Sequence, residues 1–277
     1  FTSFFGPDVV NLFGVVVLTS LGTWGLPQMV HKFYAIKDEH SVKTGTVVST
    51  IFAIIISGGC YFLGGFARLY ADADIYKADG SIMYDAIVPQ MLSTLPDILI
   101  GIVIVLVLSA SMSTLSSLVL TSSSTLTLDF IKGTIVKDMK EKTQLIVMRV
   151  LIAFFIILSV VIALNPPTFI AQLMGISWGA LAGAFLAPFM YGLYSKKITK
   201  ASVWASFIVG VGLTVSNMFF KFIASPINAG AIAMAASLIV VPLVSLVTPK
   251  MKQEQVDEMF TCYDQKVVVS EKTSLGE

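Results

Sequence analysis

Long apolar stretches, separated by short polar connections, dominate the pattern of this 277-residue chain. A helix needs about 20 apolar residues to cross the hydrocarbon layer of a bilayer. Seven stretches reach or approach that length, and we place them at about 9–31, 46–69, 97–129, 144–164, 168–194, 201–222 and 228–248. The pattern predicts an all-α integral membrane protein with seven transmembrane helices.

The first stretch is interrupted before it ends. The run from Val9 to Leu21 is apolar, but two glycines and Pro27 follow at once. Glycine weakens a helix and proline removes a backbone donor, so the sequence predicts a break between Gly22 and Pro27. Transporters build binding sites from broken helices, because irregular backbone at membrane depth is tolerated where it lines a cavity. The alternatives are a kink with only a packing role, or the end of the helix at the membrane interface.

The third stretch is rich in hydroxyl side chains over residues 109–125. On a helix, Ser113, Ser116 and Ser117 share one face, and Ala110 and Thr114 lie on the neighbouring strip. Hydroxyl and carbonyl oxygens suit a hard cation such as Na⁺. Close packing between helices explains small serine residues equally well, and spacing alone leaves both interpretations open.

Composition supports the membrane assignment. Hydrophobic residues make up 56% of the chain and charged residues 13%, whereas a soluble domain carries about a quarter charged residues. Between their ends the predicted spans contain no Asp, Glu or His. Carboxylate-based proton relay, a transition-metal site and enzymatic catalysis are therefore disfavoured. Glycine and alanine in the fifth stretch predict a close helix contact.

Basic residues are distributed unevenly among the connections. One set of alternate connections contains Lys32, Lys37, Lys43, Lys132, Lys137, Lys140, Lys142, Lys196, Lys197 and Lys200. The other set contains Arg68, Lys77 and Lys221. Cytoplasmic loops carry the excess of Lys and Arg, so the first stretch is expected to run from outside to inside. The C-terminal tail, a short solvated helix or a disordered extension, is then cytoplasmic.

Several motifs resemble those of the sodium/solute symporter family. The strongest is the run Ala110–Ser117, which continues through Ser122–Ser124 to Leu128–Lys132. Weaker likenesses follow in family order: Gly25–Gln28 with Lys32–Lys37, Gly65–Arg68, Pro89 with Leu95–Pro96, and Phe185–Pro188 with Gly192–Tyr194. The resemblance implies a ten-helix core of two inverted five-helix repeats, with additional helices outside the core.

On that pattern the chain is the C-terminal portion of a transporter. Residues 1–195 would be the second inverted repeat, 196–249 two additional helices, and 250–277 a cytoplasmic tail. The chain opens with Phe1 and enters an apolar stretch almost at once, so we interpret it as a piece of a longer protein. The first repeat, with its half of the ion and solute sites, would then lie outside it.

The resemblance also implies site residues. The principal Na⁺ site would use the Ala110 carbonyl and the hydroxyls of Ser113 and Thr114. A second Na⁺ would use Ser113, Ser116 and Ser117. Solute contacts are expected at Thr19, Gly22, Thr23, Trp24 and Pro27. Proline-transporting members carry Trp and Tyr where this chain has Thr19 and Thr23, which argues against proline as the solute.

These expectations combine into one function. The chain is expected to import a small organic solute (an amino acid, carboxylate, vitamin or sugar-like compound) by Na⁺ symport with alternating access. It would lie in the plasma (inner) membrane, use Na⁺ as coupling ion without an organic cofactor, and depend on the missing first repeat and the bilayer. The alternatives are a symporter-like membrane sensor of a signalling protein, and a channel or packing scaffold that couples nothing.

Overall fold

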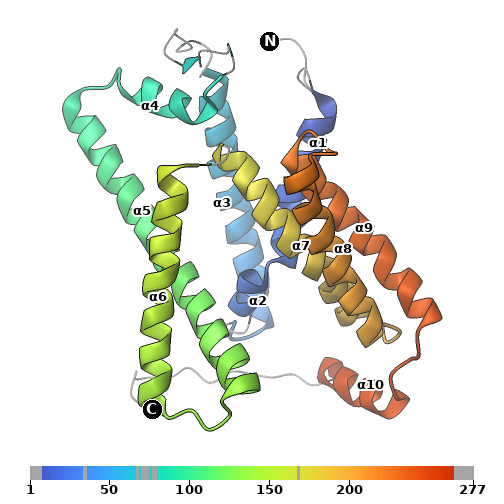
Figure 1. Cartoon of the computed structure of the whole chain (residues 1–277). Helices are drawn as coiled ribbons and strands as arrows, with labels where there is room; N and C mark the ends of the chain where they lie inside the picture. The colour runs from blue at the N-terminus through green and yellow to red at the C-terminus, as the bar shows by residue number, and fades with distance from the viewer. Residues whose placement is uncertain are drawn as a thin grey trace. The chain divides into compact units, whose positions relative to one another are not determined.

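The computed structural model describes residues 8–33, 36–66, 69, 75–76, 80, 82–166 and 169–264. These residues form helices and connections, with one isolated bridge between Tyr76 and Ile82. The helices are α1 (Val9–Ser20), η1 (Gly22–Gly25), α2 (Pro27–Phe33), α3 (Glu39–Phe66), η4 (Tyr84–Ala86), α4 (Ile87–Leu92), α5 (Asp97–Ser124), η5 (Thr125–Ile135), α6 (Glu141–Leu164), α7 (Ile170–Tyr194), α8 (Lys200–Phe220), α9 (Pro226–Val247), α10 (Gln253–Phe260) and η6 (Thr261–Asp264) (Figure 1). The predicted all-α membrane architecture is confirmed.

Among the described residues, six helices are long and apolar enough to cross a membrane: α3, α5 with η5, α6, α7, α8 and α9. The predicted count of seven is not confirmed, because the first predicted span consists of the short helices α1 and α2 joined by η1. The basic residues Arg68 and Lys77 of the predicted connections lie outside the described residues.

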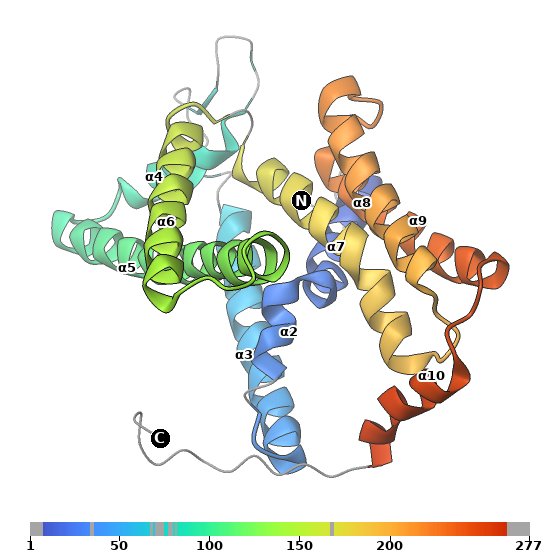
Figure 2. The same cartoon turned by 60° about the horizontal axis from the view of Figure 1, so that its bottom comes forward.

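The chain divides into two compact units, residues 1–59 with 170–277, and residues 60–169. In the first unit α7, α8 and α9 pack against one another, and α1 and η1 pack on α7 and α9. Both views show these three long helices side by side (Figures 1 and 2). Leu18, Leu186 and Met234 are fully buried at the centre of this group.

Glycine allows the three helices to approach closely. A Cβ atom on Gly179 of α7 would lie 2.5 Å from the Cα of Gly230 on α9. A Cβ atom on Gly210 of α8 would lie 2.2 Å from the carbonyl carbon of Gly183 on α7. Either distance is too short for a side chain, so the predicted small-residue face of the fifth stretch is where the backbones of α7, α8 and α9 meet.

In the second unit, η5 continues α5 without interruption, and α6 packs against both. Val119, Ser123 and Thr127 form the buried strip of α5 and η5. The η5 segment is π-helical, with the Val136 amide donating to the Ile131 carbonyl at 2.8 Å. The N-cap of α5 is Pro96, and Asp97 is the first helical residue, where its charge complements the helix dipole.

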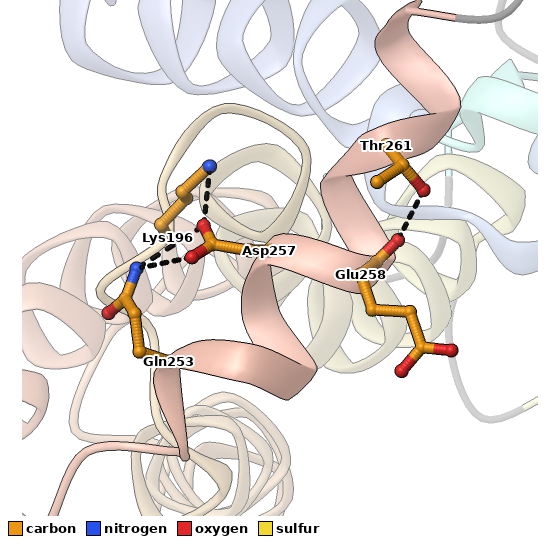
Figure 3. Close-up of polar contacts among 5 residues, drawn as sticks. All are labelled: Lys196, Gln253, Asp257, Glu258 and Thr261. Carbon is orange, nitrogen blue, oxygen red and sulfur yellow. Dashed lines mark hydrogen bonds and ion pairs between the residues drawn. The ribbon is translucent and has the colours of Figure 1, made fainter.

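The C-terminal helix α10 docks onto the connection between α7 and α8 (Figure 3). The ammonium of Lys196 lies 2.8 Å from the Asp257 carboxylate and 5.3 Å from the centre of the Phe260 ring. Just after α10, the Tyr263 hydroxyl donates to the Leu193 carbonyl at 2.7 Å. The first part of the predicted tail is therefore a helix held against the protein; residues 265–277 lie outside the described residues.

Candidate ion and solute sites

The helix break predicted between Gly22 and Pro27 is present. Helix α1 ends at Ser20, η1 covers Gly22–Gly25, and Leu26 is extended with φ −89° and ψ 115°. Pro27 then begins α2. A proline suits the first turn of a helix, because the amide that it lacks would have no partner there. Pro27 therefore starts the second helix, where the sequence alone had suggested that it distorts the first.

The break is held by tight contacts with α7. A Cβ atom on Gly25 would lie 2.8 Å from the Cα of Ala182 and 2.9 Å from the Cβ of Leu186. Gly22, also buried, faces Met234 and Ala182. Glycine at position 25 therefore serves close approach, and this contact fixes the position of η1 on α7.

A pocket of about 480 Å³ lies beside the break, within the first unit. Its lining residues are Trp24, Gly25, Pro27, Val30, Phe185, Pro188, Phe189 and Val203. The lining contains no charged side chain and is largely aromatic and aliphatic. Such a pocket can accommodate an apolar part of a small molecule, while polar groups near it would orient the remainder.

The five predicted solute residues behave differently from one another. Trp24 and Pro27 line the pocket, and the Trp24 side chain is 54% exposed. The hydroxyl of Thr19 donates to the Val15 carbonyl at 2.8 Å, and that of Thr23 to the Ser20 carbonyl at 3.0 Å. Thr19, Gly22 and Thr23 are not among the lining residues.

Sequence reasoning missed the opposite wall of the pocket. Phe185 and Phe189 come from α7 and flank Pro188, which lies inside that helix. A proline between aromatic residues in an apolar span is the signal that could have indicated them. The contact between Gly25 and α7, which places this wall next to Trp24, has no signature in the sequence.

The hydroxyls of α5 fall into two groups along the helix. From Ser116 onward they donate to carbonyl groups three or four residues earlier on the same helix, as Ser116 does to Met112 at 2.7 Å. The same holds for Ser117, Thr121, Ser122, Ser123 and Ser124. Before Ser116 the hydroxyls of Ser109, Ser111, Ser113 and Thr114 are exposed and make no hydrogen bond within the part of the chain that the structure describes.

This division matters for ligand binding. An unpaired hydroxyl in an apolar environment is unfavourable by roughly 1–3 kcal/mol, so it needs a partner from outside the helix. Ser113 and Thr114, two of the three predicted principal ligands, meet this condition. Ser116 and Ser117, predicted for a second ion, point their protons at their own backbone and keep lone pairs available. The geometry of a complete site, and its occupant, stay predictions.

Comparison with known proteins agrees with the motifs. The sequence profile of the Sodium:solute symporter family matches residues 7–210. The chain is 25% identical over 207 residues to the osmoregulated proline transporter OpuE of Bacillus subtilis, covering 75% of this chain and 42% of the relative. It is 28% identical over 198 residues to the sodium/pantothenate symporter of Haemophilus influenzae, covering 71% and 40%.

A third relative is matched over most of this chain. The high-affinity proline transporter PutP of Bacillus subtilis is 26% identical over 276 residues, covering 91% of this chain and 54% of the relative. The chain thus spans about half, or less, of the length of these relatives. No solved structure matches significantly. Because the family profile matches well over half of the sequence, this membrane protein belongs to the sodium:solute symporter family.

Proposed function

We propose that this chain is part of a transporter that imports a small organic solute together with Na⁺ by alternating access. The observation that carries the proposal is the family match over residues 7–210, joined to the unpaired hydroxyls of Ser113 and Thr114 on α5. Relatives are described as sodium/pantothenate and sodium/proline symporters, which supports Na⁺ as the coupling ion.

The principal Na⁺ site would combine the Ala110 carbonyl with the hydroxyls of Ser113 and Thr114. Three oxygens are too few for a dehydrated cation, which takes further ligands from neighbouring protein or water. Under this proposal those ligands come from the first inverted repeat. A second ion would use Ser113, Ser116 and Ser117, whose oxygens lie on one face of α5.

The solute would bind beside the broken helix. The pocket that Trp24 and Pro27 share with Phe185 and Phe189 would take an apolar part of the molecule. Broken membrane helices expose backbone groups that can hold the polar end of a solute. Thr19 and Thr23 stand where proline-transporting members carry larger aromatic residues, so a solute other than proline, such as a pantothenate-like carboxylate, is favoured.

Transport would follow from differential binding. Na⁺ would favour the outward-open state, and the solute would then complete the site before the break and α7 close over it. Low cytoplasmic Na⁺ empties the hydroxyl site and releases the solute inward. A membrane potential of about 100 mV contributes about 2.3 kcal/mol for each charge that crosses fully. In this arrangement the protein lies in the plasma membrane with α10 in the cytoplasm.

The test measures two effects of Na⁺ on the full-length transporter: one on its thermal stability and one on solute uptake. Purified protein should unfold at a higher temperature in NaCl than in choline chloride of equal strength, because a ligand that binds only the folded state stabilises it. Vesicles with an imposed Na⁺ gradient should accumulate labelled pantothenate, with labelled proline assayed in parallel.

The variants decide the assignment of the site. Combining Ser113→Ala with Thr114→Ala should abolish both effects of Na⁺, whereas Ser122→Ala, which removes a hydroxyl bonded to its own helix, should preserve them. Unchanged Na⁺ dependence in the double variant would show that the ion site lies elsewhere. A folded protein that neither responds to Na⁺ nor takes up any solute would favour a sensor.

A further inference from the structure

Two of the long helices contain a proline in their interior: Pro188 in α7 and Pro242 in α9. A proline has no amide proton, so the carbonyl four residues earlier loses its helical partner. The affected carbonyls are those of Ala184 and Leu238. Inside a membrane protein such a group must find another donor, because water is not available to replace the lost bond.

Each of these carbonyls accepts a hydrogen bond from a neighbouring helix. The Tyr191 hydroxyl of α7 donates to the Leu238 carbonyl of α9 at 3.0 Å. The Ser206 hydroxyl of α8 lies 2.9 Å from the Ala184 carbonyl of α7. Ser206 is fully buried, and Tyr191 is half-buried. A hydroxyl from another helix thus occupies the place of the missing amide at both prolines.

A second serine lies beside the Ala184 carbonyl. Ser237 of α9, fully buried, donates its proton to the Gly183 carbonyl and also contacts the Ser206 oxygen. Each hydroxyl has one proton, and Ser237 directs its own at the Gly183 carbonyl. The Ser206 proton is therefore shared between the Ala184 carbonyl and the Ser237 oxygen. The loosened turn of α7 is therefore tied to α8 and α9 together.

The same turn of α7 carries the wall of the pocket. Phe185, Pro188 and Phe189 line it, and Ala182 contacts Gly25 in the break. The direction in which α7 continues after Ala184 consequently sets how this wall faces Trp24. A change in the course of α7 at Pro188 would move Phe185 and Phe189, and would also alter the edge-to-face contact of Phe185 with Phe207 of α8.

We infer that Tyr191 and Ser206 are positioning residues, which replace the amide protons that Pro242 and Pro188 lack: Tyr191 ties α9 to α7, and Ser206 fixes the course of α7 beside the pocket. Any effect on uptake rests on the proposed function; the effect of Ser206 on the pocket does not. Neither residue touches the solute in this account, since neither is among the lining residues.

A double-variant cycle at Pro242 tests whether the Tyr191 hydroxyl replaces the missing amide as the donor to the Leu238 carbonyl. Tyr191→Phe removes only the hydroxyl, and we expect the unfolding equilibrium constant of the full protein in micelles to rise roughly threefold to tenfold. Pro242→Ala restores an amide for the Leu238 carbonyl, so Tyr191→Phe should have little effect in that background. An equal effect in both backgrounds, or none in the native one, would overturn the inference.

The matched control is Tyr194→Phe, on the same helix. Tyr194 is 76% exposed, so loss of its hydroxyl should leave the unfolding constant unchanged in either background. A penalty as large as that of Tyr191→Phe would show that the measurement reports the loss of any tyrosine hydroxyl from α7, and would also overturn the inference.

A spectroscopic measurement tests the effect on the pocket. In full-length protein whose other tryptophans are all replaced by Phe, Trp178 and Trp204 among them, the emitting indole is Trp24 in the pocket wall. Ser206→Ala should shift its emission maximum and its quenching by acrylamide in the folded state. Thr214→Val is the control, because that buried hydroxyl on α8 donates to Gly210 of its own helix at 3.0 Å. Unchanged Trp24 emission in Ser206→Ala would overturn the positioning role.

The two proposals fail in different ways. Altered Trp24 emission in a protein that shows no Na⁺-dependent uptake would uphold the positioning residues and count against symport. Normal uptake by the parent protein, with Trp24 emission that is the same in Ser206→Ala and Thr214→Val, would uphold symport and count against the positioning residues. Both results come from folded protein, so loss of stability does not imitate either one.

Discussion

Helix α8 in the first unit and helix α5 in the second both carry serine side chains, but Ser206 of α8 is bonded differently from the serines of α5. On α8, Ser206 is fully buried and bonds to a neighbouring helix. On α5, Ser116 and Ser122 are exposed and bond to the carbonyls of their own helix. The same residue type therefore joins helices in one unit and leaves a surface available for other partners in the second.

The burial of the spans follows the same division except at α3, which is 0% buried although most of it belongs to the first unit. In the apolar segment of α7, 39% of the residues are buried, and in that of α9, 33%. In the apolar segments of α5 and α6 the share is 0%. Small residues bring α7, α8 and α9 together, but α5 and α6 meet along a narrow strip. Under the proposed function, the exposed face of α5 is where ions and further transporter helices would bind.

Replacing Gly210 by Ala should cause the largest loss of stability. The added Cβ atom would lie 2.2 Å from the carbonyl carbon of Gly183 and 2.5 Å from the Ala184 amide, so α7 and α8 would have to separate. Overpacking of this kind costs about 1–3 kcal/mol, and the separation would also weaken the bond between Ser206 and Ala184. The measurement is the unfolding midpoint in detergent.

The control for this prediction lies two residues away. A Cβ atom on Gly212 would have no neighbour within 4 Å, so Gly212→Ala should be neutral or slightly stabilising because alanine favours a helix. Equal midpoints for Gly210→Ala and Gly212→Ala would mean that the close contact between α7 and α8 does not support the fold.

Single serine variants on α5 test whether the unpaired hydroxyls bind Na⁺ and the hydroxyls bonded to their own helix do not. Ser113→Ala should raise the Na⁺ concentration for half-maximal uptake about tenfold, which corresponds to the loss of one good ligand bond. Ser122→Ala should change it less than about twofold, because its hydroxyl already donates to the Leu118 carbonyl. Equal effects would remove the distinction between unpaired and back-bonded hydroxyls. A large effect of Ser117→Ala would support the second Na⁺ site.

Much of the first unit follows from local sequence. Apolar runs predict the spans, and Gly22 with Pro27 predicts the break, because these residues act through their own backbone. The role of Pro27 was not predicted, since the proline starts α2 only if Leu26 is extended. The break itself was therefore predictable from sequence, and the direction of the chain after it was not.

The candidate sites were less predictable, because they depend on neighbours and rotamers. Helical spacing places Ser113 and Ser117 on one face, but only the structure shows that Ser117 donates to Thr114 while Ser113 is unpaired. The wall formed by Phe185 and Phe189 depends on the approach of Gly25 to α7, which no local pattern encodes. Long-range packing is the information that the sequence pattern lacks.

Two side chains that close turns, Asn217 in the first unit and Gln144 in the second, allow the stability of the two units to be compared further. The Asn217 side chain closes the α8–α9 turn, because it accepts from the Ile223 amide at 2.7 Å and donates to the Ile223 carbonyl at 3.1 Å. In the second unit Gln144 makes one such bond, to the Met139 carbonyl at 2.7 Å. We expect Asn217→Ala to lower the free energy of unfolding by about 1–2 kcal/mol, and Gln144→Ala by about 0.5 kcal/mol. Chemical unfolding of each variant measures both, and the reverse order would contradict the difference in packing between the units.

The smallest effect is expected at the ion pair that holds α10. The hydrogen bond from Lys196, and then that from Gln253, lowers the pKa of Asp257 below its ordinary value of 3.8. A lowered carboxyl pKa stabilises the docked helix above the ordinary pKa, and this stabilisation is lost as the pH falls through the lowered value. Hydrogen exchange of the α10 amides should therefore be constant from neutral pH to about pH 5, once corrected for intrinsic rates, and should lose protection below about pH 4.

Exchanging the two charges tests whether the Lys196–Asp257 pair itself, and not the overall surface charge, holds α10 in place. Asp257→Asn should reduce the protection of α10 modestly, because both partners are about half exposed and salt screens them. Combining Lys196→Asp with Asp257→Lys should restore it. Glu258→Gln is the control, since Figure 3 shows the Glu258 carboxylate pointing away from Lys196. If the exchanged pair stayed as unprotected as Asp257→Asn, the ion pair would not account for the docking of α10. The contact of Lys196 with the Phe260 ring, which the exchange removes, and the Tyr263 hydrogen bond would account for it instead.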